Sequence, residues 1–256
     1  MSRLTALFKK KSSGILNVYC TAGYPALEST MDIMQALQLN NADIIELGMP
    51  YSDPLADGPV IQASSAKALE NGMTIPKLFE QLNGFRNTIQ IPVLLMGYMN
   101  PVLQFGFENF CAKAAEIGID GLILPDLPLY EFETEYGNII KKYGLDMIFL
   151  ITPETSAERI RKIDELGSGF IYAVSSSSTT GNNKPLDEQQ GYFERLKNMQ
   201  LKNPILVGFG IKDKATFDAA CLHTNGAIIG SAYIKELNAG NNIKEVTAKF
   251  LKSIVE

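Results

Sequence analysis

The sequence predicts an α/β fold, a single (β/α)8 TIM barrel with an extra N-terminal helix, in which residues 1–256 form one domain. Short apolar segments alternate with amphipathic stretches, which is typical of repeated βα units and a parallel sheet. A length of 256 residues is large for one ordinary domain but normal for this barrel. No GxGxxG motif follows the first predicted strand, where a dinucleotide-binding sheet would need it.

Eight segments have the length and apolar composition of buried strands. They lie at residues 15–20, 42–48, 92–97, 121–125, 146–152, 170–175, 204–210 and 226–231. Helical patterns lie at 28–40, 59–72, 75–85, 107–118, 130–144, 156–167, 188–200, 214–223 and 242–254. A further helix, LTALFKK at 4–10, is expected to cover the bottom of the barrel. Several helices end on glycine, and at Gly118, Gly144 and Gly167 we expect a left-handed C-cap.

Composition excludes several classes of protein. The net charge of −5 is spread along the chain, so no basic block argues for nucleic acid or an anionic membrane. The longest apolar runs are strand-sized, far below the roughly 20 residues of a membrane span. In the N-terminal MSRLTALFKKKSSG the charges follow the apolar residues, the wrong order for a signal peptide, so a cytoplasmic protein is expected. The three cysteines have no CxxC spacing, which favours reduced thiols over disulfide or metal roles.

The longest irregular segments, 49–58 and 175–187, follow the second and sixth strands. Both begin at the C-terminal end of a strand, the face on which barrel enzymes carry their chemistry. Glu46 lies near this end of the second strand, and a carboxylate there is costly to bury unless something uses it. The alternative is an acid paired with a nearby Arg, Lys or backbone amide.

The segment PYSDPLADGP after the second strand holds three prolines, one glycine and two acids, so it is stiff. Asp57 can be held over the barrel mouth opposite Glu46. It also precedes Gly58-Pro59 at a helix start, so an N-cap role is the competing interpretation.

Two glycine motifs indicate a phosphate site. Strand seven runs into Gly208-Phe209-Gly210, and strand eight runs into Gly230-Ser231 followed by the short helical AYIKEL. Glycines let backbone N–H groups approach an anion, and a helix N-terminus adds a favourable dipole. In barrels this location is the frequent phosphate site, although glycine can also simply end a strand.

The residue inventory narrows the reaction. No predicted strand contains a lysine for Schiff-base chemistry, and the only histidine, His223, precedes strand eight at the bottom face. A histidine-based metal site is excluded too, so no metal is expected. General acid–base catalysis by carboxylates remains, with burial raising a carboxyl pKa toward neutrality. Tyr172 on strand six is either a core aromatic or a partner of Glu46 across the barrel.

The segment ELGMPYSDPLADGPVIQ resembles the signature of the tryptophan synthase α-subunit family, the indole-3-glycerol phosphate lyases. The resemblance extends over the whole chain, through YCTAGYP, LLMGYMNP, LPDLP, FIYAVSSSSTTG, GFGI and IIGSAYIK. It implies retro-aldol cleavage of indole-3-glycerol phosphate to indole and glyceraldehyde 3-phosphate. Another phosphate-binding barrel enzyme, such as an isomerase, or a non-catalytic activating partner are the alternatives.

By this resemblance Glu46 is the acid–base that protonates indole C3, and Asp57 binds the indole N1–H. Tyr172 positions Glu46, and Thr180 reaches Asp57 from a mobile lid. The remaining substrate-binding positions implied are Tyr19, Gly181, Phe209, Gly210, Gly230 and Ser231.

The resemblance also implies a partner, a β subunit in an α2β2 complex. That subunit carries pyridoxal phosphate and receives the indole, while this chain has no cofactor. Asp53, Pro54 and Asn100 are expected to face the partner. One departure is the strand-six loop, where Ser176 and Ser178 replace an Arg and a Gly found in many members. The lid's closed-state contacts and its signalling to the partner depend on this difference.

Overall fold

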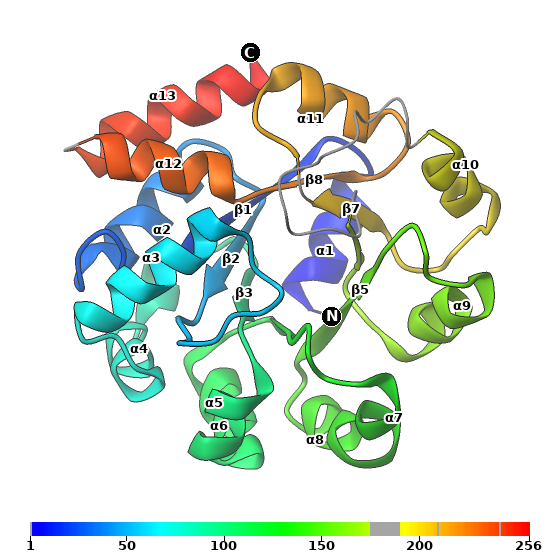
Figure 1. Cartoon of the computed structure of the whole chain (residues 1–256), viewed down its shortest axis with the longest axis horizontal. Coiled ribbons are helices and arrows are strands. Elements are labelled where there is room, and N and C mark those ends of the chain that lie inside the picture. The colour runs from blue at the N-terminus through cyan, green and yellow to red at the C-terminus, as the bar shows by residue number, and fades with distance from the viewer. Residues whose placement is uncertain (1, 175–189, 209, 241) are drawn as a thin grey trace.

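Parallel strands close into a barrel in chain order (Figure 1) in the computed structural model, which describes residues 2–174, 190–208, 210–240 and 242–256. The strands are β1 (Ile15–Thr21), β2 (Ile44–Gly48), β3 (Val93–Met96), β4 (Gly121–Ile123), β5 (Asp146–Ile151), β6 (Ile171–Val174), β7 (Ile205–Gly208) and β8 (Gly226–Ile229). Each pairs with the next and β8 pairs with β1, so the predicted barrel is confirmed. Every strand ends within two residues of its predicted limits.

The helices surround the barrel on its outside, except for α1, which lies across one end of it (Figure 1). They are α1 (Arg3–Lys10), α2 (Ser29–Leu39), α3 (Pro59–Glu70), α4 (Ile75–Gln81), η1 (Phe85–Asn87), α5 (Met99–Phe105), α6 (Phe107–Ile117), α7 (Leu129–Glu131), η2 (Phe132–Tyr136), α8 (Gly137–Lys142), α9 (Ala157–Leu166), α10 (Gln190–Asn198), α11 (Lys214–Cys221), α12 (Ser231–Ala239) and α13 (Ile243–Val255). In the described part of the chain, none of them is long and apolar enough to cross a membrane.

Three local features differ from the predictions. Helix α5 was not expected, and the helical pattern at 130–144 is interrupted by the π-helical turn η2. Gly118 and Gly144 have the expected positive φ, but Gly167 does not: it is extended, with φ −78° and ψ 168°. A Cβ on Gly167 would lie 2.9 Å from the carbonyl oxygen of Ile163 and 3.1 Å from the Phe149 ring. This glycine is therefore required for close packing and not for a left-handed cap.

The apolar core has two layers. The outer layer lies between the strands and the surrounding helices. The inner layer fills the barrel with inward-facing side chains from the alternate positions of the strands, as expected for a closed barrel of this size. Its buried members include Ile15, Ile44, Leu94, Ile123, Ile148, Tyr172, Val174, Leu206 and Ile228.

Helix α1 closes the bottom of the barrel, as predicted. Its Leu4 is fully buried and belongs to the inner layer, which Leu7 and Phe8 also contact. Gly169 gives Leu4 this position, because a Cβ there would lie 2.9 Å from the Leu4 side chain. Burial of a leucine side chain stabilises a fold by about 1.5–3 kcal/mol, so Leu4 contributes to holding the helix in place.

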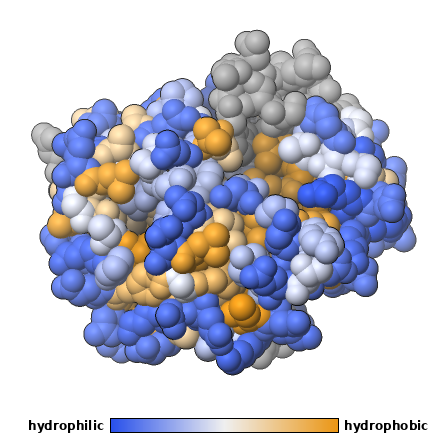
Figure 2. Space-filling view, turned by 60° about the horizontal axis from the view of Figure 1, so that its bottom comes forward, coloured by the Kyte–Doolittle hydropathy of each residue, from blue (hydrophilic) through white to orange (hydrophobic). Residues whose placement is uncertain are grey.

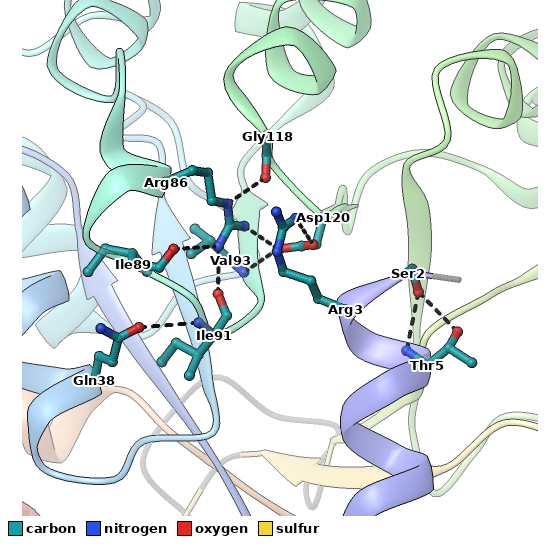
Figure 3. A network of polar contacts seen from close by, with 10 residues as sticks. All are labelled: Ser2, Arg3, Thr5, Gln38, Arg86, Ile89, Ile91, Val93, Gly118 and Asp120. Atoms are coloured by element: carbon teal, nitrogen blue, oxygen red, sulfur yellow. Dashed lines mark hydrogen bonds and ion pairs between the residues drawn. The ribbon is translucent and has the colours of Figure 1, made fainter.

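A network of charges fastens the same end of the barrel (Figure 3). Asp120 is buried just before β4 and accepts a hydrogen bond from Arg3 of α1 at 3.0 Å. Its other oxygen accepts from the Val93 amide at 2.8 Å and from the Arg86 guanidinium. Arg86 also donates to the carbonyl oxygens of Gly118 and Ile91. A buried carboxylate with this many donors is stable as an anion.

Candidate active site in the barrel mouth

Glu46 points into the barrel from β2. The side chains at alternate positions of β2 face inward, and Ile44 of that face belongs to the inner apolar layer. Glu46 is only 1% exposed and lies opposite Tyr19 in the register of β1 and β2. Its Oε2 accepts a hydrogen bond of 2.9 Å from the Asn17 amide of β1. Of the two interpretations of this acid, pairing with a cation finds no support: no lysine or arginine among the described residues forms an ion pair with it.

The pKa of Glu46 is raised to about 8, chiefly by burial; the hydrogen bond from Asn17 lowers it, and the nearby negative charge of Asp57 contributes to the increase. At neutral pH the carboxyl group is mainly protonated. It can therefore act as a proton donor at the pH at which an ordinary glutamate is ionised.

Asp57 lies in the loop between β2 and α3 and does not cap the helix. The N-cap of α3 is Gly58, and no side chain caps this end. The Asp57 Oδ2 instead accepts a hydrogen bond of 3.0 Å from the Tyr98 hydroxyl, whose oxygen accepts from the Ala56 amide. The N-cap interpretation of Asp57 is thus wrong. Tyr98 holds both the loop backbone and the carboxyl group.

Burial raises the pKa of Asp57 to about 6, and the hydrogen bond from Tyr98 opposes this change. Asp57 and Glu46 interact electrostatically, but their pKa values differ. At pH 7 Glu46 is mainly protonated and Asp57 is mainly ionised. Two carboxyl groups in one site are thereby suited to different tasks.

Two tyrosines line the same mouth, and each occupies space left by a glycine. A Cβ on Gly48 would lie 2.0 Å from the Tyr19 hydroxyl, and a Cβ on Gly208 would lie 2.3 Å from the Tyr172 ring. Both tyrosines are buried, and burial together with the negative charges of Glu46 and Asp57 raises their pKa values. Tyr172 belongs to the inner layer with Val174, the inward orientation that the strand pattern suggests. Gly208 is therefore needed for packing, whatever else its backbone does.

The glycines and the serine proposed for phosphate lie at the mouth as well. Gly230 and Ser231 begin the nine-residue helix α12, whose N-terminus carries a favourable dipole for an anion. A Cβ on Gly230 would lie 3.4 Å from the Tyr19 Cβ, so this end of α12 contacts the residue that is paired with Glu46 in the strand register. Gly210 has a φ of +78° and follows β7, the neighbour of β8. Thr180, Gly181 and Phe209 lie outside the described residues.

The rim beside β2 and β3 holds the residues predicted to face a partner. Asp53 and Asn100 are exposed, whereas Pro54 is buried within the chain. Asn100 donates a hydrogen bond of 3.0 Å to the Tyr51 hydroxyl, which links α5 to the loop after β2.

Large apolar side chains follow the same rim. Leu55 is 88% exposed, Leu103 of α5 is 45% exposed and Tyr130 of α7 is 73% exposed. They belong to three consecutive units, after β2, β3 and β4. Figure 2 brings the α5–α8 side of the barrel forward and shows hydrophobic residues gathered among hydrophilic ones on that face. A surface of this kind is typical of a protein interface.

Sequence reasoning missed two residues that contact the carboxyl groups, Asn17 and Tyr98. Asn17 had a signal, because an amide within the apolar strand ILNVYC is as unusual as a glutamate within ADIIELG. Tyr98 directly follows a predicted strand at its C-terminal end, the face that carries function.

His223 lies just before β8, at the opposite end of the barrel, stacked on Phe193. Among the residues that the structure describes, no three His, Cys, Asp or Glu side chains form a metal-binding group.

Comparisons with known proteins show the family of the chain. The family model described as tryptophan synthase alpha chain matches residues 5–256. The tryptophan synthase alpha chain of Parabacteroides distasonis is 51% identical over 255 residues, which cover 99% of both chains. The crystal structure of tryptophan synthase subunit alpha from Legionella pneumophila superposes with a TM-score of 0.90 at 34% identity, covering 100% of this chain and 97% of that one. A chain of the tryptophan synthase complex from Pyrococcus furiosus gives a TM-score of 0.84 at 32% identity, covering 95% and 98%. The chain therefore belongs to the tryptophan synthase alpha chain family.

Proposed function

We propose that the chain cleaves indole-3-glycerol phosphate to indole and glyceraldehyde 3-phosphate, and that a β subunit receives the indole for L-tryptophan synthesis. One observation carries this proposal: a buried and a half-buried carboxyl group share one barrel mouth, with the pKa of Glu46 at about 8 and that of Asp57 at about 6. Cleavage of this substrate needs both a proton donor and a fixed negative charge, and at pH 7 the pair supplies both.

In the proposed reaction Glu46 first donates its proton to C3 of the indole ring. This leaves a positive charge on the ring, centred near N1. The ionised Asp57 accepts a hydrogen bond from N1–H and stabilises that charge. The Glu46 carboxylate then takes the proton of the glycerol hydroxyl next to the ring. As that hydroxyl becomes an aldehyde, the bond from its carbon to C3 breaks and the electron pair returns to the ring. Glu46 ends protonated, as it began.

The tyrosines and the phosphate site orient the substrate in this proposal. Tyr172 and Tyr19 restrict the space beside Glu46, and Tyr172 positions that carboxyl group. The N-terminus of α12 at Gly230 and Ser231 binds the phosphate together with the Gly210 backbone. Thr180, Gly181 and Phe209 are proposed to complete the substrate site, with Thr180 reaching Asp57.

In the proposed steps the protonated indole ring itself accepts the electron pair of the breaking bond, so we propose that the chain uses no cofactor of its own. Pyridoxal phosphate is then expected in the β subunit alone. The exposed residues Asp53, Leu55, Asn100 and Leu103 form the proposed contact with that subunit, and Pro54 supports the loop from beneath. The relative from Pyrococcus furiosus has been solved as a tryptophan synthase complex, which supports such an assembly. The whole chain acts as one domain here, since the site draws on β1, β2, β6 and α12.

The test is to mix the full chain with a β subunit, supply indole-3-glycerol phosphate and measure indole and glyceraldehyde 3-phosphate. Both products should form in equal amounts. The same assay without the β subunit shows how far the partner activates the chain. Absence of indole in the presence of a β subunit that binds the chain would rule the proposal out.

A further inference from the structure

Asn17 lies in the middle of β1 and has an amide side chain that is fully buried. Its neighbours on the inward face of the strand are Ile15, in the inner apolar layer, and Tyr19 in the mouth. A buried amide costs free energy unless its hydrogen bonds are satisfied. A residue that only fills space at this position would be expected to be apolar, like most of the inner layer.

Among the described residues, the side chain of Asn17 forms a hydrogen bond with Glu46 alone. Its Nδ2 donates the 2.9 Å hydrogen bond to Oε2 of Glu46. Its Oδ1 is buried and accepts no hydrogen bond from any residue that the structure describes. An asparagine that served to join two strands would use both ends of the amide. Here only the donating end is used, and it is directed at the group that handles the proton.

We propose that Asn17 is a positioning residue that keeps Oε2 of Glu46 as a hydrogen-bond acceptor and so makes Oε1 the oxygen that gives and takes the proton. This inference rests on the proposed function. An amide N–H can only donate, so it faces the carboxyl oxygen that carries no proton. The proton of the neutral acid must then reside on Oε1.

The same contact remains when Glu46 is ionised, because the N–H donor also stabilises the carboxylate. The carboxyl group therefore has no need to rotate between the two steps. Oε1 delivers the proton to the ring carbon, and the same oxygen receives the proton from the glycerol hydroxyl. A group held within a few tenths of an ångström in this way gains rate because it does not have to be reoriented.

The charged and titratable groups around Glu46 do not offer a substitute. Asp57 faces it from the loop after β2, Tyr19 and Cys20 come from β1, and Tyr172 comes from β6. All four are acids, so none provides a positive charge. In the described part of the chain, Asn17 is the group that favours the ionised form of Glu46.

The experiment replaces Asn17 by leucine, which has a similar size and no donor, and measures the pH dependence of kcat and KM for the full chain with its β subunit. Loss of the donor raises the pKa of Glu46, so the high-pH limb of the kcat profile should move up by about one pH unit. A drop in kcat of about tenfold with an unchanged KM is expected, because positioning and not substrate binding is lost.

Asn17→Asp provides a second, graded measurement and replaces the first should the leucine variant fail to fold. A negative charge beside Oε2 disfavours the ionisation of Glu46 further. The high-pH limb of the Asn17→Asp variant should therefore lie at a higher pH than that of the wild type and that of Asn17→Leu. Val18→Ala, on the outward face of the same strand, controls for general loosening and should leave the limb in place. The inference would be overturned if, in both Asn17 variants, the high-pH limb of the kcat profile lay within roughly 0.2 pH units of the wild-type limb, which is about the error of such profiles.

A double-mutant cycle separates this inference from the proposed function. If Asn17 acts through Glu46, then Asn17→Leu should have no further effect on the rate once Glu46 is replaced by glutamine. If Glu46→Gln keeps near-full turnover, the proposed role of Glu46 is wrong. If Glu46→Gln abolishes turnover while Asn17→Leu changes neither kcat nor the pH profile, only the role of Asn17 is wrong.

Discussion

The two ends of the barrel treat a buried carboxyl group in opposite ways. At the bottom, Asp120 receives hydrogen bonds from two arginines and a backbone amide (Figure 3). At the mouth, Glu46 is equally buried, but from the described side chains it receives one hydrogen bond, from a neutral amide. The first arrangement surrounds the carboxylate with three donors, two of them positively charged. The second leaves the charged form unstable, and that instability makes the group able to exchange a proton near pH 7.

This contrast teaches how to distinguish a structural acid from a chemical one. Burial alone does not separate them, because both groups are almost fully buried. The number and charge of the hydrogen-bond donors around each carboxyl group distinguish the two. Substitutions that alter one end of the barrel at a time test this contrast.

Glu46→Gln should lower kcat by about 10³-fold, since general acid–base catalysis contributes on the order of 10²–10⁴-fold. The measurement is indole release at pH 7 with saturating substrate. The folded structure should be kept, because glutamine resembles the protonated acid.

The stability of this variant against pH provides a second check. The pKa of Glu46 in the folded chain is about 8, above its ordinary value of 4.5. An acid with a raised pKa stabilises the fold at low pH, and this contribution is lost as pH rises from about 4.5 to about 8. Urea unfolding should therefore show the wild type weakening relative to Glu46→Gln over that range. If the free energies of unfolding of the two proteins ran parallel against pH, the raised pKa of Glu46 would be contradicted.

Asp120→Asn should act on stability instead of rate. Removing one partner of a buried ion pair costs about 3 kcal/mol or more, because it leaves Arg86 with an uncompensated charge. Urea unfolding at pH 7 measures the loss, while kcat per folded molecule should stay within about twofold of wild type. A large fall in kcat with little change in unfolding would mean that the two ends are not independent.

Asp57→Asn should lower kcat by roughly 10–100-fold, since a hydrogen bond to a charged group is worth about 1.5–3 kcal/mol. In the wild type, activity should rise as pH increases through about 6, where Asp57 ionises, and fall above about 8, where Glu46 loses its proton. The variant should lose the low-pH limb, and its high-pH limb should move to lower pH, because the negative charge of Asp57 raises the pKa of Glu46. Affinity for glycerol phosphate should be unchanged, because the phosphate is proposed to bind at α12.

Tyr98→Phe should have the smallest effect, a fewfold loss of kcat at pH 7. The Tyr98 hydroxyl lowers the pKa of Asp57 through its 3.0 Å hydrogen bond, so its removal should move the low-pH limb upward. Tyr51→Phe is a matched control, because Tyr51 packs on the Tyr98 ring but its hydroxyl contacts Asn100. An equal shift in both variants would assign the effect to packing of the loop.

Most of the fold was predictable because buried parallel strands have apolar runs of characteristic length. Helix α5 was missed because its seven residues, which include Pro101 and are followed by Gly106, are too few for a clear helical period. Gly167 was misassigned because sequence shows that a glycine is present and not whether its backbone or its missing Cβ is required.

The site was predictable only in part. The position of Glu46 near the end of a strand and of Asp57 in a stiff loop predicted that they lie at the same barrel mouth. The contacts from Asn17 and Tyr98 depend on how neighbouring strands are staggered. In the ladder Asn17 is paired with Ile44, yet its side chain reaches Glu46, two residues along β2. Such a diagonal contact follows from the tilt of strands in a closed barrel and not from spacing along the chain.

The closure of the barrel by α1 has a consequence for the traffic of molecules. With Leu4 filling the inner layer from below, the described side chains close the bottom of the barrel, so a ligand of the two carboxyl groups enters from the mouth. Substrate and both products must cross the same rim, beside Leu55 and Leu103. Any partner that covers this rim controls the exchange of the site with solvent, without touching either carboxyl group.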